Sequence, residues 1–320
     1  MGWRPEPGPL TGPARATQAD IDALNRVFAD AFTDRYRRDG MAGMRVPFLN
    51  PMIWRYAIED GGEGALLWRD EAGKIAAFNM VHRSGAEGWM GPLAVRPDRQ
   101  GRGEGRRIVQ AGIDWLQLHR VRTLGLETMP RTVENIGFYS ALGFEPGRLT
   151  VTLQKEVGRR PAEPTSLSRA GARRGVLIEG CRALTDLLAP GVDFTREIEL
   201  TEQLALGDTV IVEGATGIDA FALCHSAALA EERPSDELRV LKLVARNEGA
   251  LEAALSGAAW LAHRERLQRV GVRCQTGYTA AYRRLVTQGW TVHWTDLRMT
   301  LSGFPEPVVP VGVVWSNWEI

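Results

Sequence analysis

The segment with the clearest chemical signal is Leu93–Gly105, in which an apolar run gives way to glycines at positions 101, 103 and 105. Glycine has no Cβ, so several backbone N–H groups in such a turn can approach a ligand closely. A helix is predicted to begin at about Gly103, and a helix N-terminus favours negative charge. The pattern therefore predicts a cradle for a pyrophosphate group, and the alternative is a flexible turn without a ligand.

Other kinds of site lack their residues. No Gly-Lys-Ser or Gly-Lys-Thr ending follows the glycines, as a P-loop requires, and Arg106 stands where the dinucleotide fingerprint has its third glycine. The sequence contains no Gly-x-Ser-x-Gly nucleophile motif. Its five histidines show no metal-ligand spacing, so no metal is expected.

Hydrophobic periodicity predicts the elements that position the glycine loop. Thr17 and Asp20 form a predicted capping box, and a helix follows it. Short apolar runs separated by turn residues predict strands, the first two of which form an antiparallel hairpin. The predicted strands cover 65–68, 75–82, 89–95, 124–128 and 149–155, and the predicted helices that follow Pro97 cover 103–119 and 133–142.

The second half of the chain repeats the first about 145 residues later. Three segments match in register, and the order of the elements is the same. The matches are Ile75–His82 with Ile218–His225, Trp115–Leu116 with Trp260–Leu261, and Gly143–Phe144 with Gly289–Trp290. We expect a flexible tail over 1–16, a first domain over 17–157, a linker over 158–175 and a second domain over 176–320.

Two motifs together resemble those of the Gcn5-related N-acetyltransferases (GNATs). Gln100-x-x-Gly103-x-Gly105 after Val95-x-Pro97 is similar to their acetyl-CoA signature, and the segment 135–144 looks like their second motif. The resemblance covers about Thr17–Lys155 and implies an α/β fold, a mixed sheet flanked by helices, here as two tandem domains. In this family the fourth and fifth strands splay apart, pantetheine pairs with the fourth, and acetyl passes directly from the thioester to an amine.

The resemblance also implies roles for single residues. Tyr139 would protonate the departing thiolate, for which a phenol is chemically suited; alternatively it is a core tyrosine. Asn135 would contact the cofactor or, alternatively, cap its helix. The backbone of the fourth strand would pair with pantetheine through Leu93, Ala94 and Val95. Main-chain N–H groups would hold the pyrophosphate at Gln100, Gly101, Arg102, Gly103, Glu104 and Gly105. Nearby arginines (Arg99, Arg102, Arg106 and Arg107) either assist or form a solvated helix end.

Many members of the family carry the carboxylate that acts as general base on or beside the fourth strand, but Trp89–Val95 contains none. Glu127, on the predicted fifth strand, is the best substitute, and an ordinary strand-end role is equally open. His82 is the second candidate. Its counterpart His225 lies in the second half, so a structural role for the pair is at least as well supported.

The second half has lost the chemistry-bearing residues. Counting by the repeat offset, Gln100 corresponds to Ala245, Gly103 to Glu248, Gly105 to Ala250 and Tyr139 to Leu285. A carboxylate and added Cβ atoms obstruct a phosphate cradle. We therefore expect a degenerate second domain that packs on the first or shapes its acceptor pocket, a layout similar to that of mycothiol synthase.

One strand is missing from the first half. The family fold has two strands after the second helix, but only 149–155 precedes the expected linker, whereas the second half offers 291–301 and 308–318. Either the C-terminal strand or part of the linker is expected to complete the first sheet.

Composition restricts partners and location. Lys plus Arg and Asp plus Glu both total 39, so attraction to nucleic acid or an anionic membrane is not expected. No apolar run is long enough to span a bilayer. Cys181, Cys224 and Cys274 form no disulfide pattern, which fits the cytoplasm. The expected activity is acetyl-CoA-dependent N-acetyltransfer by a monomer or homodimer, and the alternative is a non-catalytic acetyl-CoA sensor or assembly module.

The acceptor amine is a small molecule or a peptide. Four arginines in the segment after the first helix, together with three aromatic residues, either receive an anionic or aromatic amine or form a solvated basic face. They are Arg35, Arg37, Arg38 and Arg45, with Phe48, Trp54 and Tyr56.

Overall fold

The computed structural model describes residues 8–158, 163–231 and 233–317. Positions 1–7 of the expected tail and 159–162 of the expected linker lie outside these ranges. Residues 8–16, assigned to the tail, instead contain strand β1 (Thr11–Arg15), which pairs with β2 (Ala65–Arg69). Leu10 and Ala16 on either side of β1 are buried, so the strand is part of the fold.

The first half follows the predicted order of elements, and the predicted hairpin is confirmed. One helix was not predicted, α2, although Asn50 caps it and Pro51 occupies its first position, a recognisable start signal. Besides β1 and β2, the helices and strands of this half are α1 (Ile21–Arg38), α2 (Pro51–Gly61), β3 (Ile75–Ser84), β4 (Glu87–Val95), α3 (Glu104–Leu118), β5 (Thr123–Thr128), α4 (Val133–Ser140) and β6 (Phe144–Glu156).

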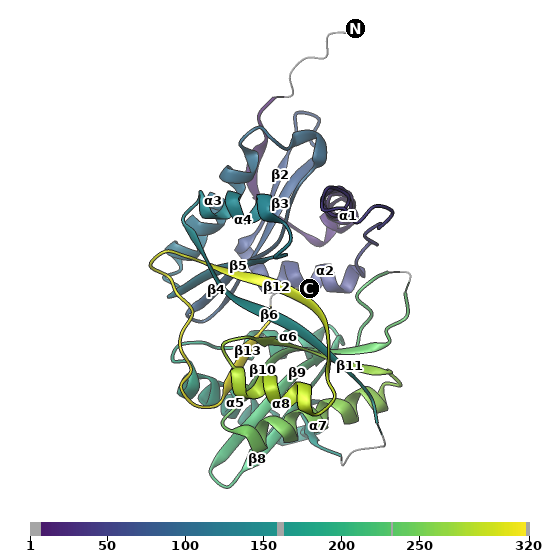
Figure 1. Ribbon diagram of the computed structural model, residues 1–320, viewed down its shortest axis with the longest axis vertical. Coiled ribbons are helices and arrows are strands. Elements are labelled where there is room, and N and C mark those ends of the chain that lie inside the picture. Colours follow the sequence, from purple (N-terminus) through teal and green to yellow (C-terminus); the bar gives the residue numbers. More distant parts are fainter. Residues whose placement is uncertain (1–7, 159–162, 232, 318–320) are drawn as a thin grey trace.

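The second half repeats this order (Figure 1). Part of the expected linker is structured, because Thr165–Ser166 forms β7 and α5 begins at Arg174. The elements after β7 are α5 (Arg174–Leu188), α6 (Thr195–Gln203), β8 (Gly207–Gly214), β9 (Gly217–His225), β10 (Glu237–Ala245), α7 (Glu248–Arg264), β11 (Arg269–Gln275), α8 (Thr279–Thr287), β12 (Thr291–Leu301) and β13 (Val313–Ser316).

The two halves exchange strands in one continuous sheet. Its order is β1-β2-β3-β4-β5-β12-β6-β11-β10-β9-β8-β7, with β13 paired to β10. Strand β12 of the second half therefore lies between β5 and β6, and β6 of the first half lies between β12 and β11 (Figure 1). The strand missing from the first half is thus Thr291–Leu301, rather than the last strand of the chain or the linker.

Helices cover both faces of the first half's sheet. Leu24 of α1 and Trp54 of α2 share one core with Phe78 of β3. Ile108 of α3 lies in a second core that contains Val81, also of β3. Since successive strand residues point to opposite faces, β3 supplies both cores. The loop before α3 and the start of α4 are thereby fixed on one face.

The exchange predicts that the halves cannot fold separately. Residues 1–158 expressed alone lack β12, so β5 and β6 keep unpaired backbone edges, which favour aggregation. We expect this fragment to be insoluble or unfolded by circular dichroism, and co-expression with residues 159–320 to yield a soluble one-to-one complex. A folded, monomeric first half with a cooperative thermal transition would contradict the prediction.

Candidate functional site

The fourth and fifth strands of the first half separate part-way along their length. Glu87–Met90 of β4 pair in parallel with Thr123–Leu126 of β5. Further along, β4 pairs with β3 across an irregularity at Gly91, and no strand of the described chain pairs with Gly91–Val95 on the β5 side. The predicted pantetheine residues Leu93, Ala94 and Val95 all lie in this separated part.

The glycine loop at the end of β4 has free donors. Gly101 and Gly103 adopt φ values of +75° and +82°, which favour glycine, and an added Cβ at either would meet nothing within 4 Å. Gly103 precedes α3 without a side-chain cap. Within the described residues, the backbone N–H groups of Gly101 through Gly105 donate no hydrogen bond. They form an uncapped helix N-terminus suited to an anion.

Two motif residues shape this loop. The Gln100 side chain donates to the Val95 carbonyl at 2.8 Å and so closes the turn. A Cβ on Gly105 would lie 3.3 Å from the Phe138 ring, so this glycine permits close packing of α3 on α4. The Gln100 side chain and the absence of a side chain at Gly105 are thus explained by the shape and packing of the loop, whereas the Gly105 N–H stays among the free donors.

The charged residues of the loop divide into two groups. Arg99 is buried and pairs with Glu71 at 2.7 Å, and Arg107 donates to the Leu10 carbonyl at 2.9 Å. The Glu104 carboxylate accepts from the Leu10 N–H at 3.3 Å. Arg107 and Glu104 thus hold Leu10 before β1, and Arg99 donates to the Gly8 carbonyl of the same segment at 3.0 Å. Arg102 and Arg106, by contrast, are exposed beside the free N–H groups.

Helix α4 places Tyr139 against the separated strands. Its side chain lies in the apolar cluster that contains Met90 and Val95 of β4, with its ring centroid 6.1 Å from that of Phe144. In the described structure its hydroxyl makes no hydrogen bond. Burial raises the pKa of Tyr139 above its ordinary value, so the phenol keeps its proton at neutral pH.

Asn135 sits on the first turn of the same helix. Its Nδ2 lies 3.4 Å from Thr128 Oγ1, at the end of β5. The side chain therefore reaches toward the separated strands, and Thr132, rather than Asn135, occupies the N-cap position.

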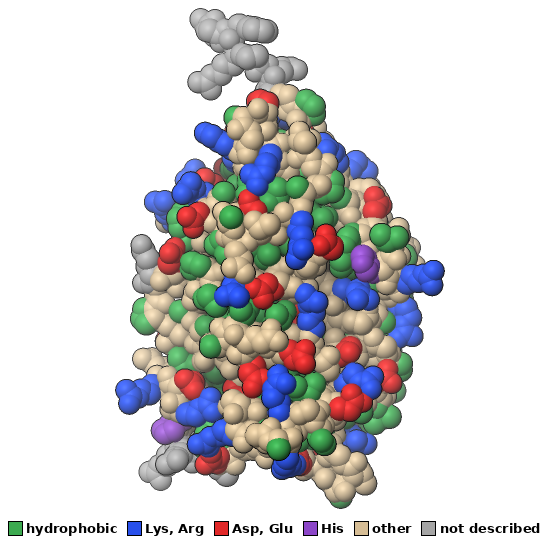
Figure 2. Space-filling view, turned by 180° about the vertical axis from the view of Figure 1, so that it is seen from behind, with side chains coloured by type: hydrophobic (Ala, Val, Ile, Leu, Met, Phe, Trp, Pro, Cys, Tyr) green, Lys and Arg blue, Asp and Glu red, His purple; other side chains and the backbone are tan. Residues whose placement is uncertain are grey.

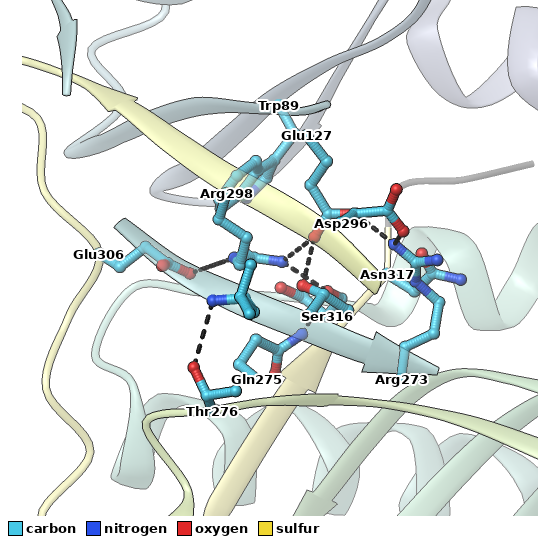
Figure 3. A network of polar contacts seen from close by, with 12 residues as sticks. Trp89, Glu127, Arg273, Gln275, Thr276, Asp296, Arg298, Glu306, Ser316 and Asn317 are labelled. Atoms are coloured by element: carbon cyan, nitrogen blue, oxygen red, sulfur yellow. Dashed lines mark hydrogen bonds and ion pairs between the residues drawn. The ribbon is translucent and has the colours of Figure 1, made fainter. Parts of the chain in front are cut away.

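Glu127 lies in a buried ionic network rather than beside a free cavity (Figure 3). Its Oε1 accepts from Arg298 of β12 and from Thr150, both at 2.6 Å, and Oε2 pairs with Arg273 of β11. Burial opposes ionisation, but the two guanidiniums outweigh it and hold the pKa of Glu127 below its usual range. This environment disfavours Glu127 as a general base. Neither arginine was identified from the sequence.

His82 is held at both ring nitrogens. Nδ1 lies 2.7 Å from Asp60 Oδ2, and Nε2 lies 3.0 Å from the Gly91 carbonyl oxygen. Both ring nitrogens are therefore engaged by groups of the first half. Through its contact with the Gly91 carbonyl, His82 fixes Gly91 where β4 leaves β5.

The equivalent loop of the second half is deleted. Ala77 pairs with Val95 in the first half and Ala220 with Ala245 in the second, so Ala245 corresponds to Val95. Only Arg246 and Asn247 then separate β10 from α7. The sequence-based equivalences of Gln100 with Ala245, Gly103 with Glu248 and Gly105 with Ala250 are therefore wrong, because the uniform offset did not allow for a deletion here.

The second half's site is also closed by its own chain. Asn247 accepts from the Ala250 N–H at 2.9 Å and caps α7. Strands β10 and β11 separate after Val240 and Val272, and Val313–Ser316 pair with β10 in the space that opens. Buried Leu285 of α8 takes the place of Tyr139.

The four arginines do not act as one group, and the expectation that they follow the first helix is wrong for three of them, because Arg35, Arg37 and Arg38 lie in the last turn of α1. Arg35 pairs with Asp39 at 2.6 Å, and Arg38 pairs with Asp34 at 2.6 Å. Arg37, by contrast, lines a hollow between α1 and the following segment. The other residues of this hollow are Ala29, Asp30, Thr33, Gly43, Met44 and Arg45.

The second half supports the segment that joins α1 to α2. The Asn50 N–H donates to the Leu229 carbonyl at 2.9 Å, and the Glu231 N–H donates to the Phe48 carbonyl at 3.0 Å. Leu49 and Ala230 form an isolated antiparallel bridge between them. The loop between β9 and β10 thus holds one wall of the first half in place.

Comparison with known proteins decides the family. Residues 24–144 match the model of the Acetyltransferase (GNAT) family. This half belongs to the GNAT family. The chain is accordingly an N-acetyltransferase enzyme by class, and the matched residues contain the separated strands, the glycine loop and Tyr139.

Solved structures show the tandem GNAT fold over the whole chain. A protein from Pyrococcus horikoshii has a TM-score of 0.66 at 16% identity and covers 93% of this chain and 92% of its own. A GCN5-related N-acetyltransferase from Sphaerobacter thermophilus has a TM-score of 0.59 at 18% identity, over 91% and 95%. A tandem GNAT protein from the clavulanic acid biosynthesis pathway has 0.59 at 12%, over 92% and 98%. A search of curated proteins gives no match.

Other site classes find no group in the described chain. Among residues 8–158, 163–231 and 233–317, no three His, Cys, Asp or Glu side chains are placed to hold a metal. No described helix combines the length and apolarity needed to cross a membrane. On the face in Figure 2, basic and acidic side chains are interspersed, in line with the balanced charge.

The network around Glu127 predicts a stability defect. Glu127→Gln keeps the shape but leaves Arg273 and Arg298 without the shared carboxylate, and we expect a loss of about 3 kcal/mol in the free energy of unfolding. Because the pKa of Glu127 is lowered in the folded state, the contribution is present above its ordinary pKa of 4.5 and is lost as the pH falls.

Urea unfolding at pH 7 and pH 3 measures both effects, and the gap between wild type and variant should shrink at pH 3. Glu179→Gln, which removes an exposed pair with Arg182, is the control and should change little. Unchanged stability together with lost turnover would instead support Glu127 as the base.

Proposed function

We propose that the first half transfers the acetyl group of acetyl-CoA directly to an amine and that the second half is a non-catalytic partner. The proposal rests on one observation. The strands separate at equivalent places in the two halves, β4 from β5 and β10 from β11, but the two sites differ in the chain that lies between the strands and in the loop that follows. In the first, no strand of the described chain pairs with Gly91–Val95 on the β5 side, and the strand ends in a loop whose N–H groups donate no hydrogen bond there. The second contains β13 and lacks the loop. A cosubstrate with a pantetheine arm and a pyrophosphate fits only the first.

The cosubstrate contacts follow from the backbone. The peptide groups of Leu93–Val95 pair with pantetheine as a further strand would. The N–H groups of Gly101–Gly105 hold the pyrophosphate, with the positive end of α3 and the exposed Arg102 and Arg106 adding favourable charge. Gln100 contributes through the shape of the turn, and Asn135 faces the arm from α4.

In the transfer step, the amine nitrogen attacks the thioester carbonyl carbon, a C–N bond forms and the C–S bond breaks. Tyr139 supplies its phenolic proton to the departing sulfur, and the phenolate then regains a proton from water. The nitrogen loses its proton to water, since Glu127 and His82 are both committed to other partners.

The acceptor approaches along α1 and the segment before α2. Arg37 and Arg45 suit an acceptor with an anionic group, and the loop carrying Leu229 sets the position of this wall. We place the activity in the cytoplasm, a setting in keeping with three free, buried cysteines. We expect the acceptor to be a small-molecule or peptide amine and the enzyme to be a monomer or homodimer.

Cosubstrate binding is tested at the cradle. Gly103→Glu introduces a side chain at φ +82° and a negative charge beside the phosphates, so acetyl-CoA binding should be lost. Titration calorimetry should give one site per chain in the wild type. The matched control is Gly249→Glu, at the start of α7, which should bind normally. Two sites in the wild type, or undiminished affinity in Gly103→Glu, would contradict the assignment.

The acid role is tested by Tyr139→Phe. Removal of one hydroxyl that makes no hydrogen bond in the described structure should leave acetyl-CoA affinity within about twofold and lower kcat roughly 10²-fold or more with any accepted amine. Tyr282→Phe on α8 is the control and should leave both unchanged. Equal turnover by Tyr139→Phe would exclude the phenol as the acid. Binding without turnover across a broad amine screen would favour a sensor instead.

A further inference from the structure

A groove of the second half binds an extended segment by its backbone. Strands β10 and β11 pair over Glu237–Val240 and Arg269–Val272 and then separate. In the space between them, Val313–Ser316 run antiparallel to β10, with Ser316 opposite Lys242 and Val313 opposite Ala245.

The other edge of the segment is recognised as well. The Tyr278 hydroxyl donates to the Val314 carbonyl at 2.9 Å and accepts from the Val314 N–H at 3.3 Å. Gln275 Nε2 donates to the Ser316 carbonyl at 3.2 Å. Side chains at and just after the end of β11 therefore replace a neighbouring strand, so the groove satisfies backbone groups on both sides of its occupant.

The side chains of the segment alternate between two cores. Val313 and Trp315 join the core under α7 and α8, and Trp315 is 2% exposed. Val314 joins the core under α5 and α6. This alternation is that of a strand buried on both faces.

The segment reaches the groove as a separate piece of chain. The connection from β12 has little regular structure and exposes Val308 and Val311. Gly312 then turns into the groove with φ +78°, where a Cβ would lie 2.4 Å from the Ala245 carbonyl oxygen. At the far end, Ser316 Oγ donates to Glu87 Oε1 on β4 of the first half at 2.7 Å.

We propose that this groove is a strand-docking site for an extended apolar peptide and that residues 313–316 of the same chain are its occupant. Recognition comes from main-chain hydrogen bonds to Lys242–Ala245 and Tyr278 and from the buried indole of Trp315. The site selects a peptide and not an acyl-CoA, because Asn247 already caps α7 and no glycine loop precedes it. The proposal does not depend on the activity of the first half.

The experiment separates the segment from the chain after folding. A protease recognition site is placed at the exposed connection around Val308–Val311 of the full chain, and the folded protein is cleaved. Gel filtration with mass spectrometry then reports whether the C-terminal piece stays bound, and hydrogen exchange reports on the amides of Lys242–Ala245. A labelled peptide with the sequence of residues 312–317 measures rebinding to cleaved protein from which the piece has been washed out.

We expect the piece to be retained, the amides of 242–245 to exchange faster after its removal, and the peptide to restore their protection. A peptide with Trp315→Ala should bind roughly a hundredfold more weakly, because a large buried ring is lost. Val292→Ala, at an exposed position of β12 outside the altered connection, is the control in the cleaved chain and should leave retention unchanged. Unaltered exchange after removal, or equal binding of the Trp315→Ala peptide, would overturn the docking site. A second acetyl-CoA bound by the emptied protein would overturn its peptide selectivity.

Discussion

At the junction of the halves, the carboxylate of Glu127 lies between Arg273 and Arg298, two guanidiniums that both belong to the second half. Arg273 occupies in β11 the position that Glu127 occupies in β5, as the strand registers show. If two first halves paired, two carboxylates would meet at this position. If two second halves paired, two guanidiniums would meet. Like charges that are buried together are strongly unfavourable. We infer that this position makes unlike halves pair, and the exchange of β6 with β12 depends on that pairing.

The same duplication explains why one site is complete and the other is not. In both halves two parallel strands separate, and the exposed backbone of each needs a partner. The second half supplies one from its own chain and shortens the loop before α7. The first half keeps its glycines and an uncapped α3, so within the described residues the N–H groups of Gly101–Gly105 donate no hydrogen bond. The loop between β9 and β10 of the second half holds Phe48–Asn50.

Local signals predicted the glycine loop and the elements of the first half other than β1 and α2, because periodicity, turns and caps depend on neighbouring residues. They failed where the contacts of a residue are made with parts of the chain far away in the sequence. The partners of Glu127 lie 146 and 171 residues away, and no pattern near it signals a buried network. A single repeat offset for the whole chain could not reveal that the loop before α7 is missing. Helix α2 could have been found from Asn50 and Pro51, and β12 was predicted as a strand but its partner was not.

Strand exchange also has a consequence for synthesis on the ribosome. The first half needs Thr291–Leu301 to complete its sheet, so it cannot finish folding when its own residues have emerged. At roughly 5–20 residues per second, the second half takes on the order of ten seconds to follow. During that time β5 and β6 present open edges, which are prone to pairing with other nascent chains. A tandem protein of this design therefore depends on chaperone protection more than two independently folding domains would.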